Sequence, residues 1–105
     1  MAQGEIRVGD VSSRFIATIK DGDDIVDLTT ASVLQLIFHK PDATVVTKTA
    51  SLYTDGTDGK LSWATTATTD LDQEGYWKLQ GYVEFSGGGK YHSDIKQFQV
   101  HPNLN

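Results

Sequence analysis

Hydrophobic and polar residues alternate most regularly between residues 76 and 85. One set of alternate positions carries apolar or small side chains, namely Trp77, Leu79, Gly81, Val83 and Phe85. The other set is polar or amphipathic, namely Tyr76, Lys78, Gln80, Tyr82 and Glu84. Because successive side chains of a strand point to opposite faces, this pattern predicts a strand with one face in the core and the other exposed.

Shorter segments between turn signals repeat the pattern. They predict strands at residues 5–8, 14–20, 33–40 and 60–65, with core side chains Ile6, Val8, Phe15, Ala17, Ile19, Leu34, Leu36, Phe38, Leu61 and Trp63. In residues 44–53, Lys48 breaks the series formed by Val46, Ala50 and Leu52, which indicates an edge strand. The spacing favours an all-β sandwich or barrel rather than a helical protein.

Residues 90–100 change phase. Tyr91 and Ile95 are odd-numbered core candidates, whereas Phe98 and Val100 are even-numbered. A strand of unbroken period two cannot bury both pairs on one face. We therefore expect a β-bulge near residues 96–97, with burial of both faces at one end as the alternative.

Composition narrows the function classes. The 105 residues predict one domain over 1–105, the net charge is −5, and no Lys/Arg cluster indicates nucleic-acid binding. The absence of cysteine excludes disulfides and thiolate metal sites, which is compatible with folding in a reducing cytosol. Neither a signal peptide nor an apolar run of membrane-spanning length is found, so we expect a soluble protein made in the cytoplasm.

Candidate chemistry is sparse. His39, His92 and His101 lie on separate predicted segments without a nucleophile spacing, so we expect no catalytic residue, metal or cofactor. The acidic turns at 21–24 and 55–59 could supply calcium ligands, but turn chemistry alone explains their Asp and Gly content. Ser86 with Gly87, Gly88 and Gly89 predicts a flexible hairpin tip, a candidate contact loop, since the helix and Lys of a phosphate-binding loop are missing.

Residues 73–79 resemble the corner of immunoglobulin domains, whose usual pattern is Asp-x-Gly-x-Tyr-x-Cys. Gln73, Gly75, Trp77 and Leu79 occupy those places, and the acidic residue is displaced to Asp72. The departures exclude the disulfide-bonded lineage. A hydrogen bond that pins this corner must come from the indole N–H of Trp77, because no phenol is present.

A second resemblance covers most of the chain. Four short motifs occur in the same order as in the immunoglobulin-like domain that begins phage baseplate upper proteins. They are Val26-Asp27-Leu28-Thr29, Lys40-Pro41-Asp42, Asp58-Gly59-Lys60-Leu61 and the segment from Leu71 to Trp77. Where that family usually has Gly, this chain has Ala43, which predicts a turn without positive φ, such as type I. The resemblance implies an immunoglobulin-like antiparallel β-sandwich of about seven to eight strands and a non-enzymatic virion role.

The expected function is assembly into a phage tail or baseplate, beside other virion proteins present in many symmetric copies. Decoration of the phage head is an alternative, and so is a carbohydrate-binding adhesion module that engages cell-surface glycans. The candidate partner-binding residues are Tyr76, Tyr82 and Tyr91 with the glycines of the hairpin tip, because interfaces are rich in Tyr. The core and corner residues are Gly75, Trp77, Leu79, Val83, Phe85 and Trp63.

Overall fold

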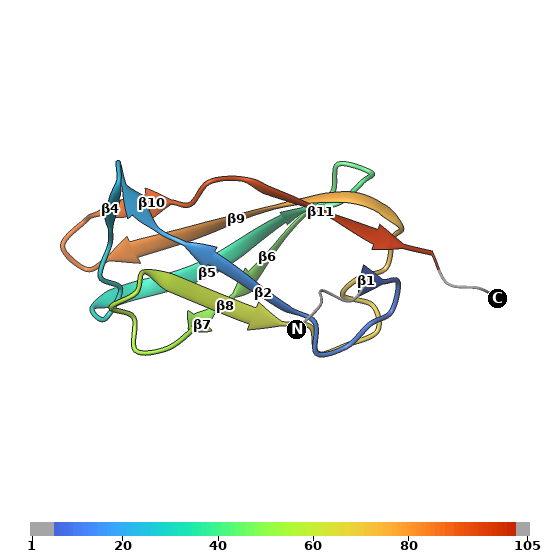
Figure 1. Ribbon diagram of the computed structural model, residues 1–105, viewed down its shortest axis with the longest axis horizontal. Helices are drawn as coiled ribbons and strands as arrows, with labels where there is room; N and C mark the ends of the chain where they lie inside the picture. Colours follow the sequence, from blue (N-terminus) through green and yellow to red (C-terminus); the bar gives the residue numbers. More distant parts are fainter. Residues whose placement is uncertain (1–5, 103–105) are drawn as a thin grey trace.

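The computed structural model describes residues 6–102 and contains eleven strands, with no helix among those residues (Figure 1). The strands are β1 (Ile6–Arg7), β2 (Arg14–Thr18), β3 (Lys20–Asp21), β4 (Asp24–Ile25), β5 (Ala31–His39), β6 (Val45–Thr49), β7 (Ser51–Leu52), β8 (Lys60–Ala64), β9 (Gly75–Phe85), β10 (Lys90–His92) and β11 (Lys96–His101). The all-β prediction is confirmed. The expected number of strands was too low, because residues 44–53 and 90–100 each form two strands and the turn at residues 20–25 adds the two-residue strands β3 and β4.

The regularly alternating segment forms β9, the central strand of the largest sheet. This sheet, called sheet A, has the order β1-β11-β9-β5-β6, and β10 also pairs with β9. All its pairings are antiparallel except that of β1 with β11. Sheet B has the order β2-β8-β7, and β3 pairs with β4 in a separate hairpin. The predicted first strand is present, although Glu5 lies outside the described residues.

One apolar core joins sheets A and B. Phe15 of sheet B meets Phe38 of sheet A edge to face, with ring centres 5.3 Å apart. Phe98 stacks on Trp77, whose ring centre is 5.9 Å away. Among the predicted core residues, Trp77, Leu79 and Val83 are buried, whereas Phe85 and Trp63 are partly buried against the same cluster. Aromatic pairs of this geometry add about 0.5–1.5 kcal/mol each beyond the area that they bury.

Residues 44–53 pass from one sheet to the other. β6 forms the edge of sheet A, as predicted, and β7 belongs to sheet B. Ala50 lies between them, is 7% exposed, and donates its N–H to the Leu34 carbonyl at 2.9 Å. The side chain of Lys48 points inward, as those of the alternate residues Val46 and Ala50 do. Its ammonium is accommodated there 5.3 Å from the Trp63 ring centre and 3.3 Å from an Asp70 carboxylate oxygen.

The phase change in residues 90–100 arises from one extra residue, as a bulge would give, but it lies before the predicted position. His92 pairs with Tyr82 and Lys96 with Leu79, so residues 93–95 lie opposite only residues 80–81. β11 pairs with β9 in unbroken register from Lys96 onward, so no bulge lies at residues 96–97. The ladder is instead interrupted at residues 93–95, between β10 and β11. Ser93 fills the gap, since its hydroxyl accepts the Gly81 N–H at 2.7 Å. The interruption turns Ile95 outward to 64% exposure, so its predicted burial is wrong.

The turn at residues 40–44 also corrects a prediction. Ala43 adopts φ 73°, in the left-handed region, rather than a turn without positive φ. The Lys40 N–H bonds the Thr44 carbonyl, and the Ala43 N–H bonds the Lys40 carbonyl, both at 2.9 Å. A three-residue hairpin loop places its last residue in the left-handed region to match strand twist. Asp42 supports this loop by accepting the Thr44 N–H at 2.9 Å.

Candidate partner-binding surface

The exposed face of sheet A is the most extensive candidate surface. Strand pairing aligns the polar positions of β9 with alternate positions of β5 and β6, in the rows Tyr82–Gln35–Thr49, Gln80–Ile37–Thr47 and Lys78–His39–Val45. On the other side of β9, His92 lies beside Tyr82 and Gln97 lies beside Lys78. We call this set of residues, with Tyr76 and Ile95, the outer face.

The three predicted tyrosines do not form one patch. Tyr76 is 60% exposed at the beginning of β9. Tyr82 follows it by six residues on the same face, a separation of about 20 Å along a strand. Tyr91 pairs with Val83 and packs edge to face on Phe85, so it lies on the core side. The structure therefore places Tyr76 and Tyr82 on the outer face and removes Tyr91 from it.

Tyr82 is held in place by its neighbours. Its phenol donates a hydrogen bond of 2.6 Å to the Glu84 carboxylate, and its ring lies 4.8 Å from that of His92, centre to centre. The hydrogen bond to Glu84 raises the pKa of Tyr82. Because the ring is already fixed, a partner that contacts it loses little side-chain entropy on binding.

The outer face differs from the rest of this acidic chain in its charge. Of the 14 acidic residues, Glu84 alone lies on a strand of sheet A within the described residues, and its carboxylate accepts the Tyr82 phenol. Exposed aliphatic side chains lie here too, with Val45 at 53% and Ile95 at 64% exposure. A shallow hollow of about 190 Å³ on this face is lined by Ile37, His39, Lys78, Leu79, Gln80 and Ile95. Low charge with exposed apolar groups is typical of the centre of a protein interface.

Sequence reasoning identified only part of this surface. Val45 and Ile95 were assigned to an irregular edge and to the core, respectively, although both are exposed on the outer face. Their placement depends on pairing register and on the interruption after β10. The local signals for this surface were the alternation within β9 and that within β5, where Gln35 and His39 lie on the face opposite to that of Leu36.

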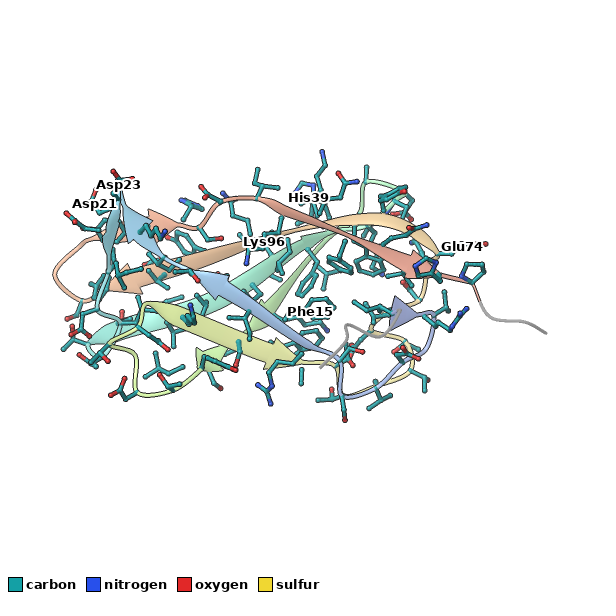
Figure 2. The ribbon with its side chains drawn as sticks, in the orientation of Figure 1. Phe15, Asp21, Asp23, His39, Glu74 and Lys96 are labelled. Carbon is teal, nitrogen blue, oxygen red and sulfur yellow. The ribbon has the colours of Figure 1, made fainter. Side chains whose placement is uncertain are left out.

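The glycine hairpin lies at one end of the molecule. The Phe85 N–H bonds the Gly89 carbonyl at 2.8 Å and the Gly88 N–H bonds the Phe85 carbonyl at 2.9 Å, so Ser86 to Gly89 connect β9 to β10 as predicted. A Cβ at Gly87 or Gly88 would meet nothing within 4 Å. The tip is therefore open and close to the acidic β3–β4 hairpin, whose Asp21 and Asp23 lie at the same end (Figures 1 and 2).

The corner before β9 is closed by bonds between the two motifs that carry the phage resemblance. The Trp77 indole N–H donates to the Gln73 carbonyl at 3.1 Å, which confirms the expected source of the corner bond. The Lys40 ammonium lies 3.0 Å from an Asp72 carboxylate oxygen, and the Gln73 amide donates to Asp42 at 2.8 Å. Hydrogen bonds from Thr44 and Gln73 lower the pKa of Asp42. These motif residues therefore stabilise the fold.

The Val26 to Thr29 motif is structural as well. Leu28 is 1% exposed, and its N–H bonds the Gly56 carbonyl at 2.8 Å. Asp55 accepts the Thr57 amide and hydroxyl, which lower its pKa, and Asp58 accepts the Lys60 N–H at 3.0 Å. The carboxylates of this turn therefore cap its own backbone and hydroxyl groups.

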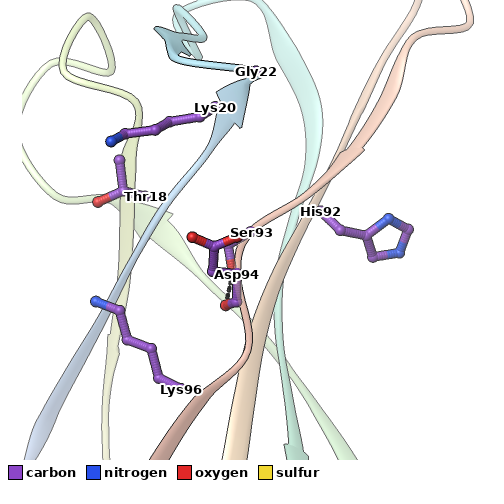
Figure 3. A pocket seen from close by; sticks show the side chains of 7 residues that line it. All are labelled: Thr18, Lys20, Gly22, His92, Ser93, Asp94 and Lys96. Atoms are coloured by element: carbon purple, nitrogen blue, oxygen red, sulfur yellow. Dashed lines mark hydrogen bonds between the residues drawn. The ribbon is translucent and has the colours of Figure 1, made fainter.

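A second hollow, of about 390 Å³, separates the beginning of β3 from the β10–β11 connection. Figure 3 shows its two walls. Thr18 and Lys20, from β2 and β3, form one wall, and Ser93, Asp94 and Lys96, from the β10–β11 connection and the beginning of β11, form the other. His92 projects to the opposite side of its own strand. The two lysines and Asp94 give the hollow mixed charge, which selects no ligand class.

Neither catalysis nor metal binding gains support from the histidines. His39 lies beside Lys78 and His92 beside Tyr82, on opposite sides of β9, so the two do not approach each other across the sheet. Within residues 6–102, no group of three or more His, Asp or Glu side chains is arranged to hold a metal ion. The same residues include no helix with the length and hydropathy of a membrane span.

Comparison of the chain with protein-family models, with curated proteins and with solved structures gave no match.

Proposed function

We propose that this chain is a non-enzymatic structural protein of a tailed-phage virion, which docks into the tail or baseplate through the outer face of sheet A. The observation that supports this proposal is the charge of the outer face. A protein of net charge −5 keeps this face nearly free of carboxylates while it exposes Tyr76, Val45 and Ile95. Neighbouring acidic proteins meet with less repulsion on such a face.

We further propose that sheets A and B form an immunoglobulin-like sandwich. Support comes from the corner, where the Trp77 indole bonds a carbonyl four residues upstream, as the phenol of a tyrosine corner does. The buried contacts between Phe15 and Phe38 across the two sheets also agree with this arrangement.

The first experiment is mass spectrometry of purified phage particles from a lysate of the host that carries the gene. We expect peptides of this chain to copurify with tail proteins in fixed stoichiometry. Their absence from the particles would contradict a virion role, and their presence in heads separated from tails would assign the chain to the head.

A variant test examines the docking face. Ile95→Asp places a carboxylate on the outer face and should reduce incorporation at least tenfold. Ser51→Asp adds the same charge on the exposed side chain of β7 in sheet B and should leave incorporation unchanged. Equal incorporation of both variants would assign docking to another surface.

The carbohydrate-binding alternative is tested on a glycan array. Under the virion proposal the purified chain gives no saturable signal. A signal that is abolished by Tyr76→Ala or Tyr82→Ala would favour the adhesion module.

A further inference from the structure

The free edge of β6 has the features of a strand-pairing site. β6 is bonded to β5 on one side, and no other strand pairs with it in the described part of the chain. Two backbone hydrogen bonds lie at the ends of the β5–β6 ladder, in the same register as its residue pairs: the Lys40 N–H donates to the Thr44 carbonyl, and the Ala50 N–H donates to the Leu34 carbonyl. Antiparallel ladders alternate hydrogen-bonded and non-bonded pairs, so the even-numbered residues bond to β5. The odd-numbered residues Val45, Thr47 and Thr49 therefore direct their N–H and C=O groups away from the sheet.

This edge has only one of the usual protections against pairing. Native edge strands are protected by proline, by bulges or by charged side chains, including lysines and charges that point inward. β6 is Val-Val-Thr-Lys-Thr, with high β-propensity throughout and an unbroken register on β5. Its one protective charge is the inward-pointing Lys48, which is neutralised by Asp70 at 3.3 Å, and the outward positions Val45, Thr47 and Thr49 carry no charge.

The other open edges fit a partner less well. β1 and β7 have two residues each, and β10 lies against β3. β2 has the same length as β6, but its first residue, Arg14, places an exposed charge on the strand. β6 is therefore the longest edge of the described chain without an outward charge.

We propose that β6 pairs antiparallel with β6 of a second copy of this chain, around a two-fold axis through Thr47. Thr47 then faces Thr47 of the second copy, and Val45 faces Thr49 in both directions. These three pairs would form about six backbone hydrogen bonds, two for each hydrogen-bonded pair. The arrangement extends sheet A across both molecules.

The second copy is the fitting occupant because the edge is self-complementary. An antiparallel two-fold interface places the same patch on both molecules. At net charge −5, two copies repel each other, and contact requires a surface without like charges. The outward row of β6 is uncharged, and the pairing places Lys48 opposite Val46 rather than opposite another Lys48.

The decisive test is a charge swap at Thr47. We expect the wild-type chain to be a dimer by size-exclusion chromatography with light scattering at high micromolar concentration. Thr47→Glu and Thr47→Lys each place like charges across the axis, so each variant alone should be monomeric. An equimolar mixture should recover the dimer as a one-to-one heterodimer. Gln97→Glu and Gln97→Lys, on the exposed far side of the same face, are the matched controls and should remain dimeric.

A second measurement requires no substitution. Amide hydrogen exchange of the wild type should slow at least tenfold for Val45, Thr47 and Thr49 between low and high protein concentration. The amides of Val46 and Lys48 already bond to β5 and should change little. A monomeric wild type, dimeric Thr47 variants, a mixture that stays monomeric, or unchanged exchange at Val45, Thr47 and Thr49 would each overturn the proposal. Because these measurements use the purified chain alone, they are independent of virion docking.

Discussion

The two ends of the molecule are built differently. At the corner end, residues 40–44 and 70–77 are joined by side chains, including the Lys40–Asp72 ion pair and the Asp42–Gln73 hydrogen bond. At the hairpin end, residues 20–25 and 85–90 have no side-chain hydrogen bond or ion pair among the described residues, and their turns are closed by backbone bonds. Figure 2 shows Glu74 at one end and Asp21 and Asp23 at the other.

The difference indicates that the corner end contributes to the stability of the fold, whereas the hairpin end is free to contact a partner. The corner end fixes where β9 begins, because Gly75 at φ 124° lies directly against Pro41. The hairpin end fixes little beyond its own turns, so its residues can change conformation or sequence at low cost. Substitutions of the same kind at the two ends should therefore have unequal effects.

The largest effect is expected for Trp77→Ala. The substitution removes a buried ring that is 1% exposed and leaves a cavity, which should lower the free energy of unfolding by about 3–5 kcal/mol. Tyr53→Ala is the aromatic control, because Tyr53 is 45% exposed and should cost less than about 1 kcal/mol. Urea denaturation followed by fluorescence measures both. Equal losses of stability would contradict the assignment of Trp77 as a core residue that stabilises the corner end.

The next effect compares two glycines. Gly75→Ala forces a Cβ within 3.0 Å of Pro41 Cγ at a positive φ, and should cost about 1–3 kcal/mol. Gly87→Ala meets no atom within 4 Å at the hairpin tip and should change stability by less than about 1 kcal/mol. Thermal unfolding measures the pair. A tolerated alanine at residue 75 would mean that the corner is not rigid.

Asp70 gives the corner end a pH dependence. Burial opposes its ionisation, but hydrogen bonds from the Thr66 and Ala67 amides and from Lys48 outweigh this and lower the pKa of Asp70. A carboxyl with a lowered folded-state pKa stabilises the fold above its unfolded pKa of about 3.9 and loses that contribution as pH falls through the folded value.

Asp70→Asn should therefore cost about 1–2 kcal/mol at pH 7, since hydrogen bonds to a charged group are lost. The difference from wild type should shrink as the pH approaches 2. Denaturation curves at pH 7, 4 and 2.5 check this convergence. A difference that does not vary with pH would assign the effect to packing.

The smallest effect compares two exposed acids. Asp72→Ala removes the ion pair with Lys40. Because the Asp72 side chain is 43% exposed, the substitution should lower the free energy of unfolding by only about 0.2–1 kcal/mol, and this loss should decrease with added salt. Asp23→Ala at the hairpin end removes no bond and should be neutral within about 0.5 kcal/mol. Chemical denaturation at low and high salt separates the two.

The sequence predicted the core-facing residues of the strands better than the places where the strands are interrupted. Alternation identified Phe15, Leu36, Phe38 and Val83 as core residues, and each is buried. The prediction succeeds because every side chain of a strand must lie on one of its two faces, and one face is the core. The outward position of Ile95 could not be predicted, since it depends on where the ladder is interrupted.

Turn geometry was the other weak point. Ala43 adopts a left-handed φ because a three-residue hairpin loop requires it, and the residue type does not indicate that requirement. Tyr91 was predicted both as a core candidate, from alternation, and as a partner residue, from its type; pairing with Val83 directs it to the core, so the partner assignment is wrong. Pairing register is a long-range property, and local patterns do not contain it.

The parallel pairing of β1 with β11 gives the domain a particular response to mechanical load. Ile6 pairs with Val100, and Arg7 pairs with His101, so the two strands run side by side in the same direction. A pull on the beginning of β1 and the end of β11 loads their hydrogen bonds together, in shear, instead of opening them one after another. The Arg7 guanidinium, which donates to the Pro102 carbonyl at 2.8 Å, shares that load. A domain held by its two ends would therefore resist extension until this short pair breaks as a unit.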